Sequence, residues 1–242
     1  MKNFSVIAFL IIAFNISNVF ALDINDENVK NAIKNDDVTA MENFIEQGFE
    51  VNSRDENGNT PLYIALIQNR LDIAKKLIDA GADVNAPSAE NGMTPLIIAT
   101  SRAGKLQQKA EKILNNSKGY TQSRANEFKL QKYIAHQMNI AQKMLTMLID
   151  EGADVNQETP FGTPLMNAVT NSWNIDIIDI LLKSGAQINA RDRKGRTALF
   201  YGEVLGGDKI SSKLLAAGAD IDIRDNAGKS YLEITKEELL EN

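Results

Sequence analysis

The sequence predicts an all-α solenoid of helix–turn–helix units joined by short hairpin fingers. One observation is a glycine that follows a Leu/Ile-rich segment and recurs at intervals of 33, 71, 33 and 33 residues. A second is a Thr-Pro-Leu triplet, intact or degenerate, that follows about 12 residues after the glycine. Self-similarity at one fixed period is the signature of a repeat architecture. The recurring glycines are Gly48, Gly81, Gly152, Gly185 and Gly218.

Residues 1–21 differ from the rest of the chain and are interpreted as a signal peptide. Lys2 precedes a short apolar run, and a small residue, Ala21, stands at the expected cleavage point. The run is shorter than the roughly 20 apolar residues that a membrane span requires. We therefore expect a mature chain of residues 22–242 that is periplasmic or secreted. The alternative is an uncleaved N-terminal anchor.

Residues 22–54 are predicted to form an N-terminal capping repeat. They contain two amphipathic helical patterns but no Thr-Pro-Leu start. Terminal repeats of this kind shield the core of a stacked array from water. The apolar positions at helical spacing are Val29, Ala32, Ile33, Met41, Phe44 and Ile45.

Residues 55–87 show the regular unit. Thr60 is suited to cap a helix, and Pro61 suits the first helical position because proline has no N–H to satisfy there. Gly81 ends the second helix at a position where a positive φ is accessible to glycine. The same pattern predicts repeats at 158–190 and 191–223, and a C-terminal cap at 224–242.

The third repeat, residues 88–157, is longer than the others. Its excess fits one repeat carrying an insertion of 38 residues, or a hidden degenerate repeat. Residues 125–150 contain no glycine or proline and keep a helical stripe, enough for a helix of ~39 Å. The stripe comprises Phe128, Ala135, Met138, Ala141, Leu145 and Leu148. We predict a projecting hairpin of two lengthened helices, with the insertion at about 104–139.

Positive charge is concentrated in this insertion. The chain has 26 basic and 32 acidic side chains, but from Arg102 to Lys143 there are nine basic and two acidic ones. This segment has a net charge of +7, and the rest of the mature chain has −14. The basic hairpin is defined by Lys105, Lys109, Lys112, Lys129, Lys132 and Lys143, at helical spacing.

The basic hairpin has a functional and a structural interpretation. The functional one is an electrostatic surface for a partner protein with an acidic patch, and an anionic membrane surface is a weaker candidate. Nucleic acid is the weakest candidate because an exported, acidic chain seldom meets it. The structural interpretation is two solvated helix faces.

The composition excludes much catalytic chemistry. The chain has no cysteine and one histidine, so disulfides, thiolate metal sites and cysteine nucleophiles are absent. His136 has no carboxylate one helical turn away to orient it as a base. We predict no cofactor, no metal and no enzymatic activity. A hydrolase within the insertion, or an envelope spacer without a stable partner, are the alternatives.

The recurring Gly-Ala-Asp-Val-Asn and Thr-Pro-Leu motifs resemble those of the ankyrin-repeat family, whose unit is about 33 residues with a T-P-L-H-x-A motif. The resemblance covers roughly 26–240 apart from 101–140. One departure is that the family's histidine is replaced by Tyr63, Ile97, Met166 and Phe200. Hydrophobic contact must therefore replace the hydrogen bonds that this histidine makes between neighbouring units.

The resemblance implies a protein-binding module that uses its finger tips and the inner faces of its first helices. Together with the predicted signal peptide, it leads us to expect a module that acts outside the cytoplasm. Exported bacterial ankyrin proteins of this size look like partner-binding, inhibitor or immunity-type proteins. Trp173 lies in a turn and either anchors a partner or folds over the next repeat. The other transferred positions are Glu56, Asn57, Asn59, Gln68, Glu90, Asn91, Met93, Arg102, Phe161, Arg193, Lys194 and Arg196.

Overall fold

A computed structural model describes residues 22–101, 123–171 and 174–234. The predicted signal peptide, the first arm of the predicted hairpin, and both Arg102 and Trp173 lie outside these residues. The chain divides into two compact units, residues 1–82 and 83–242. Apart from one isolated bridge between Thr159 and Gly162, the regular elements of the described residues are helices, as predicted.

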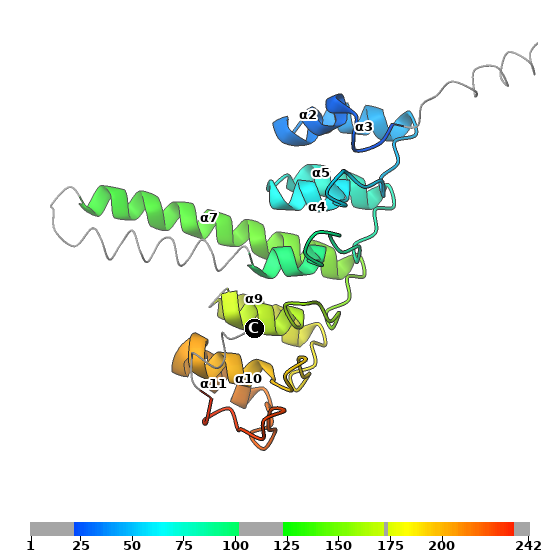
Figure 1. The fold of residues 1–242 in the computed structure, drawn as a ribbon. Helices are drawn as coiled ribbons and strands as arrows, with labels where there is room; N and C mark the ends of the chain where they lie inside the picture. Colours follow the sequence, from blue (N-terminus) through cyan, green and yellow to red (C-terminus); the bar gives the residue numbers. More distant parts are fainter. Residues whose placement is uncertain (1–21, 102–122, 172–173, 235–242) are drawn as a thin grey trace, which may run out of the picture. The chain divides into compact units, whose positions relative to one another are not determined.

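Unit 1 contains two helix pairs, drawn in blue and cyan in Figure 1. The Asp26 carboxylate caps the first helix by accepting from the Asn28 N–H, and Asp36 turns the chain between the first two helices with a φ of 60°. The helices are α2 (Glu27–Asn35), α3 (Val38–Glu46), α4 (Pro61–Ile67) and α5 (Leu71–Asp79).

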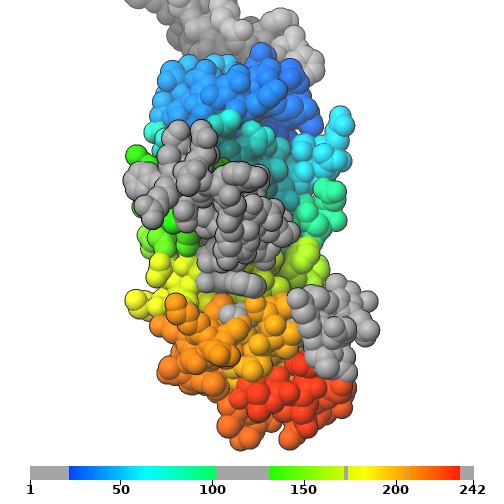
Figure 2. Space-filling model, turned by 90° about the vertical axis from the view of Figure 1, so that its left-hand side faces the viewer, coloured from blue at the N-terminus to red at the C-terminus, as the bar shows by residue number. Residues whose placement is uncertain are grey.

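Unit 2 continues the pattern, and Figure 2 shows its later repeats following one another in chain order from green to red. Its first helical residues are 95–101, and residue 101 is the last of the described range 22–101. The first helix of the last pair changes to a π-helix before the second begins. The elements are α7 (Ser123–Asp150), α8 (Pro164–Asn171), α9 (Ile175–Lys183), α10 (Ala198–Tyr201), η1 (Gly202–Gly206) and α11 (Gly207–Ala216).

Helix α7 has two parts with different surroundings. Its C-terminal part serves as the second helix of the third repeat and packs on α9, with Gln142 donating to Asp176 at 3.2 Å. Its buried residues are Ala141, Met144, Leu145 and Leu148, whereas none of residues 131–140 is buried. The predicted helix over 125–150 is confirmed, but part of its apolar stripe is not buried, because Ala135 is exposed and Met138 is half-buried. Figure 1 shows α7 extending well beyond the other helices of unit 2.

The Thr-Pro-Leu triplets start helices for the predicted reason. The hydroxyl oxygens of Thr60, Thr94 and Thr163 each accept from the backbone N–H three residues later, at 3.2–3.3 Å. Thr197, which is followed by alanine instead of proline, makes no side-chain cap bond. Threonine thus caps three of the four helices that these triplets precede.

The side chains that replace the family's histidine belong to the hydrophobic core of each unit. Tyr63, Ile97, Met166 and Phe200 are all buried, with at most 7% of each residue exposed. Unit 2 adds a polar link that the sequence did not predict. The buried Asn167 carbonyl oxygen accepts from the Thr100 hydroxyl at 2.9 Å and from the Ser101 hydroxyl at 2.7 Å.

An asparagine ladder explains why the Gly-Ala-Asp-Val-Asn motif recurs. The Asn85 side chain donates to the Gly152 carbonyl at 3.2 Å and accepts from the Asp154 N–H at 2.8 Å. Each ladder asparagine therefore binds the start of the same motif in the following repeat. The other rungs join Asn52 to Gly81, Asn156 to Gly185 and Gln187, and Asn189 to Asp220.

Candidate partner-binding site

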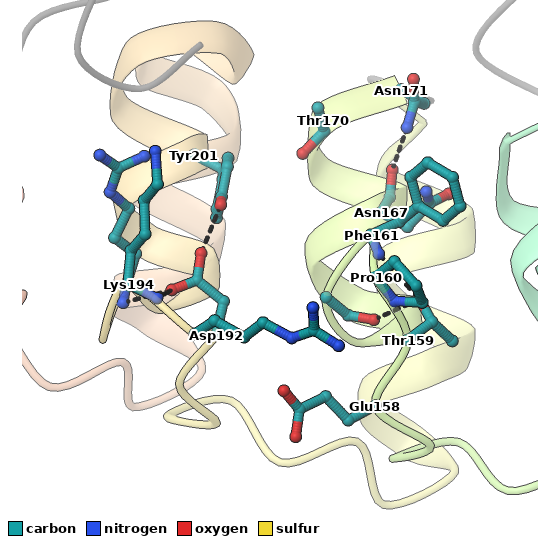
Figure 3. Close-up of a pocket in the computed structure, with 13 residues that line it drawn as sticks. Glu158, Thr159, Pro160, Phe161, Asn167, Thr170, Asn171, Asp192, Lys194 and Tyr201 are labelled. Atoms are coloured by element: carbon teal, nitrogen blue, oxygen red, sulfur yellow. Dashed lines mark hydrogen bonds between the residues drawn. The ribbon is translucent and has the colours of Figure 1, made fainter. Parts of the chain in front are cut away.

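A pocket of about 540 Å³ lies within unit 2, between repeat four (158–190) and repeat five (191–223). We call it the repeat 4–5 pocket. Figure 3 shows its two sides: Phe161, Asn167, Thr170 and Asn171 come from repeat four, and Asp192, Lys194 and Tyr201 come from repeat five. Each side consists of a finger and the first helix that follows it.

The finger of repeat four presents Phe161. The Thr159 hydroxyl accepts from the Phe161 N–H at 3.1 Å and donates to the Gly162 carbonyl at 2.9 Å, and the backbones of Thr159 and Gly162 also bond to each other. This turn leaves Phe161 49% exposed, although large apolar side chains are usually covered. Gly162 has a φ of 80°, and a Cβ there would lie 2.8 Å from the Met166 sulfur.

The finger of repeat five is organised by Asp192. Its Oδ1 accepts from the N–H groups of Lys194 and Arg196, each at 2.8 Å, and its Oδ2 accepts from the Tyr201 hydroxyl at 2.5 Å. Burial raises the pKa of Tyr201, and the hydrogen bond to the Asp192 carboxylate raises it further. Tyr201 therefore stays protonated, and its hydroxyl keeps the finger attached to α10.

Cationic side chains cluster on the finger of repeat five. Arg193 is exposed and Lys194 is half-buried, and none of the ion pairs among the described residues involves Arg193. Glu158 is exposed at the pocket and comes from repeat four. The carboxylate of Asp192 is occupied by the turn and by Tyr201. We call the repeat-five side, which carries the exposed Arg193, the cationic side, and we call the repeat-four side, which carries the exposed Pro160 and Phe161 beside Glu158, the apolar side.

Four of the predicted contact residues meet at this pocket: Phe161, Arg193, Lys194 and Arg196. Arg196 differs from an exposed contact residue because only 6% of it is accessible. Its backbone helps to close the finger, since its carbonyl accepts from the Asp192 N–H at 2.9 Å. We therefore assign Arg196 mainly to the support of the pocket.

In unit 1 the predicted contact residues have different environments. Glu56, Asn57 and Gln68 are exposed. Asn59 is only 8% exposed, and both its backbone N–H and its side-chain amide bond to the Asp55 carboxylate. Asn59 is therefore a structural residue of its finger, and its assignment to a contact surface needs correction.

The remaining predictions fall on the third repeat and on α7. Glu90 is exposed, whereas Asn91 and Met93 are half-buried and bonded to each other through the Asn91 side chain at 3.0 Å. Lys132, Lys143 and His136 are exposed on α7. Of Lys129 only the helical backbone is described. Lys105, Lys109, Lys112, Arg102 and Trp173 lie outside the described residues.

Several residues of the pocket were not predicted from the sequence, chiefly Tyr201, Asn167 and Asn171. Asp192 had a usable signal, because Asp55 and Asp225 begin the fingers of other repeats and accept from the same two backbone positions. Tyr201 had no such sequence signal, because the pocket that it lines exists only between two neighbouring repeats.

In the described ranges, no group of three or more His, Asp or Glu side chains is arranged to hold a metal ion. Within the same part of the chain, every helix is too short or too polar to cross a membrane.

Comparison with known proteins places these features in context. A family model described as ankyrin repeats (3 copies) matches residues 29–122 and 133–225. Neurogenic locus notch homolog protein 1 of Xenopus tropicalis is 30% identical over 173 residues, which cover 70% of this chain and 7% of that protein. Human ankyrin repeat and SOCS box protein 6 is 26% identical over 167 residues, covering 64% and 31%. The chain thus spans less than a third of either relative.

Solved structures show the same likeness. An ankyrin repeat domain from Acinetobacter baumannii AYE matches with a TM-score of 0.63 and 26% identity. The match covers 85% of this chain and 88% of that one.

Proposed function

The chain belongs to the ankyrin-repeat family, and we propose that it binds a partner protein at the repeat 4–5 pocket. Ankyrin repeats are protein–protein interaction modules, generally without enzymatic activity. In this chain, the binding surface is proposed to be the repeat 4–5 pocket. It also predicts that the protein acts outside the cytoplasm, because residues 1–21 have the pattern of a signal peptide.

The observation that carries this proposal is the exposure of Phe161 at the rim of a preformed pocket. Aromatic side chains supply a disproportionate share of binding energy at protein interfaces. The finger that holds Phe161 is tied by four hydrogen bonds between Thr159, Phe161 and Gly162. An anchor that is already ordered loses little conformational entropy on binding.

The basic hairpin is proposed to assist by steering. Lys132 and Lys143 are exposed on the projecting helix α7, as an electrostatic role requires. Exposed charges of one sign attract a complementary partner during diffusion and raise its association rate, an effect that salt screens. An acidic partner is therefore expected, and an inhibitor or immunity-type role outside the cytoplasm fits a rigid binder without chemistry of its own.

The test compares capture by closely matched variants. Residues 22–242 are immobilised and exposed to periplasmic and culture-medium extracts of the source organism, followed by mass spectrometry. We expect one or a few proteins to be captured by the wild type and lost with Phe161→Ser. Leu232→Ser is the control, because Leu232 is an exposed apolar residue that does not line the pocket.

Two outcomes would contradict the proposal. Capture that is identical for Phe161→Ser and Leu232→Ser would move the partner surface elsewhere, and the absence of any captured protein would favour an envelope spacer. For steering, the six hairpin lysines are changed to glutamine and the association rate with the captured partner is measured at low and high salt. An association rate that is unchanged at low salt would remove the hairpin from the mechanism.

A further inference from the structure

We infer that the repeat 4–5 pocket recognises a partner segment in which an Asp or Glu stands next to a large apolar residue. The inference rests on the proposed function and specifies the chemistry of its partner. It follows from the different character of the two sides of the pocket.

The first step concerns the cationic side. Arg193 is exposed on the finger of repeat five, and no ion pair found in the described ranges involves it. The nearest acidic group of that finger, Asp192, uses both carboxylate oxygens within the protein. A guanidinium forms its strongest hydrogen bonds with a carboxylate, so an acidic side chain is the matching ligand.

The second step concerns the apolar side. Phe161 and Pro160 are exposed on the finger of repeat four, across the pocket from the finger of repeat five in Figure 3. An apolar side chain of the partner would cover the Phe161 ring and remove both surfaces from water. The pocket of about 540 Å³ lies within the range of roughly 300–1,000 Å³ typical of ligand pockets, so it can admit adjacent side chains.

The third step fixes the orientation. Glu158 is exposed on the apolar side, where its carboxylate would repel a carboxylate of the partner. The acidic residue of the partner must therefore point to Arg193, and the apolar residue must point to Phe161. A segment with the reverse charge would place a cation against Arg193, which is unfavourable at short range.

The experiment is a selection with random dodecapeptides displayed on phage, using residues 22–242 as the target. We expect the enriched peptides to share an acidic residue beside Leu, Ile, Phe, Tyr or Trp. A parallel selection against Arg193→Glu is expected to replace the acidic residue by Lys or Arg. A misfolded variant would not select peptides in which a basic residue replaces the acidic one. Lys183→Glu is the control, since Lys183 is exposed on α9 and does not line the pocket.

Fluorescence anisotropy then quantifies one enriched peptide and its counterpart with Lys in place of the acidic residue. Arg193→Glu should weaken the acidic peptide at least tenfold and strengthen the lysine peptide, whereas Lys183→Glu should change neither by more than twofold. Inorganic phosphate, added at the ionic strength of the assay, should not displace the acidic peptide. Displacement would mean that the pocket binds simple anions, and the inference would be overturned.

The inference and the proposed function fail in different ways. Enriched peptides that lack an acidic residue, or that bind Arg193→Glu as well as the wild type, overturn the inference. Capture of the natural protein by wild type and its loss with Phe161→Ser would then still support the proposed function. Capture that does not depend on Phe161 overturns the proposed function whatever the peptides show.

Discussion

The Tyr201 hydroxyl donates a 2.5 Å hydrogen bond to Asp192, and this bond joins the finger of repeat five to its first helix. The same carboxylate accepts from two backbone N–H groups of the finger through its other oxygen. Loop and helix are therefore connected by one side chain, and the position of the cationic side of the pocket depends on it.

Replacing Tyr201 by phenylalanine should lower the free energy of unfolding by about 1–3 kcal/mol, because a hydrogen bond to a charged group is lost. Urea unfolding at pH 7 measures the change. Tyr231→Phe is the control, since Tyr231 is a partly buried tyrosine that packs against the same core and does not line the pocket. Equal stability of the wild type and Tyr201→Phe would contradict the assigned role.

The raised pKa of Tyr201 predicts a pH dependence with a definite sign. Because the folded-state pKa lies above the unfolded value of about 10, its stabilisation is complete below pH 10 and is lost as pH rises further. The stability difference between wild type and Tyr201→Phe should therefore narrow above pH 10. In tyrosinate absorbance titrations the wild type should show one late-ionising tyrosine that Tyr201→Phe lacks. If the wild-type titration contains no tyrosine that ionises later than those of Tyr201→Phe, the prediction is wrong.

The glycine of the repeat-four finger can be tested with a matched pair. Gly162→Ala introduces a Cβ 2.8 Å from the Met166 sulfur at a φ of 80°, whereas Gly228→Ala has a similar φ of 82° and open space around the new atom. Both should lose about 1 kcal/mol from backbone strain. Only Gly162→Ala should also shift the Phe161 finger and weaken partner binding. Equal binding by the two variants would show that the finger tolerates the contact.

The buried Asn167 should contribute more than an average polar residue. Asn167→Leu leaves the Thr100 and Ser101 hydroxyls without this acceptor, and we expect a loss of about 2–3 kcal/mol in urea unfolding. Adding Ser101→Ala to that variant should recover part of the loss, since the Thr100 hydroxyl keeps the Ile97 carbonyl as an acceptor at 2.9 Å and the Ser101 hydroxyl is removed. No recovery would indicate that packing, and not the hydrogen bonds, accounts for the effect.

The asparagine ladder predicts a difference between internal and terminal positions. Asn156→Asp removes the amide donor to the Gly185 carbonyl and should cost about 1 kcal/mol. Asp222 occupies the equivalent position in the Gly218 motif, where it is exposed and already lacks an amide donor. Asp222→Asn should therefore change stability by less than about 0.5 kcal/mol. Equal effects at both positions would mean that the ladder bonds contribute nothing.

Much of the fold could be predicted because its determinants are local. Threonine hydroxyls cap the helices that follow them, and the glycines after the second helices take positive φ, as at Gly81 with 92°. The long helix α7 was predicted for a similar reason, since residues 125–150 lack breakers. Its burial was not predictable to the same extent, because Ala135 lies beyond the repeat against which the helix packs.

The sequence by itself determined the phase of the repeats, the helix starts and the candidate finger positions, because each depends on residues within one turn or one helix. Only the tertiary structure decided which finger residues remain accessible: Phe161 and Arg193 do, whereas Asn59 and Arg196 are buried. It also decided that Tyr201 meets Asp192 and that Asn167 meets Thr100. The physical reason is that both contacts join separate elements: Asn167 and Thr100 come from helices of different repeats, and Tyr201 and Asp192 come from a helix and the finger before it. Such contacts depend on how the elements pack, which neither local sequence specifies.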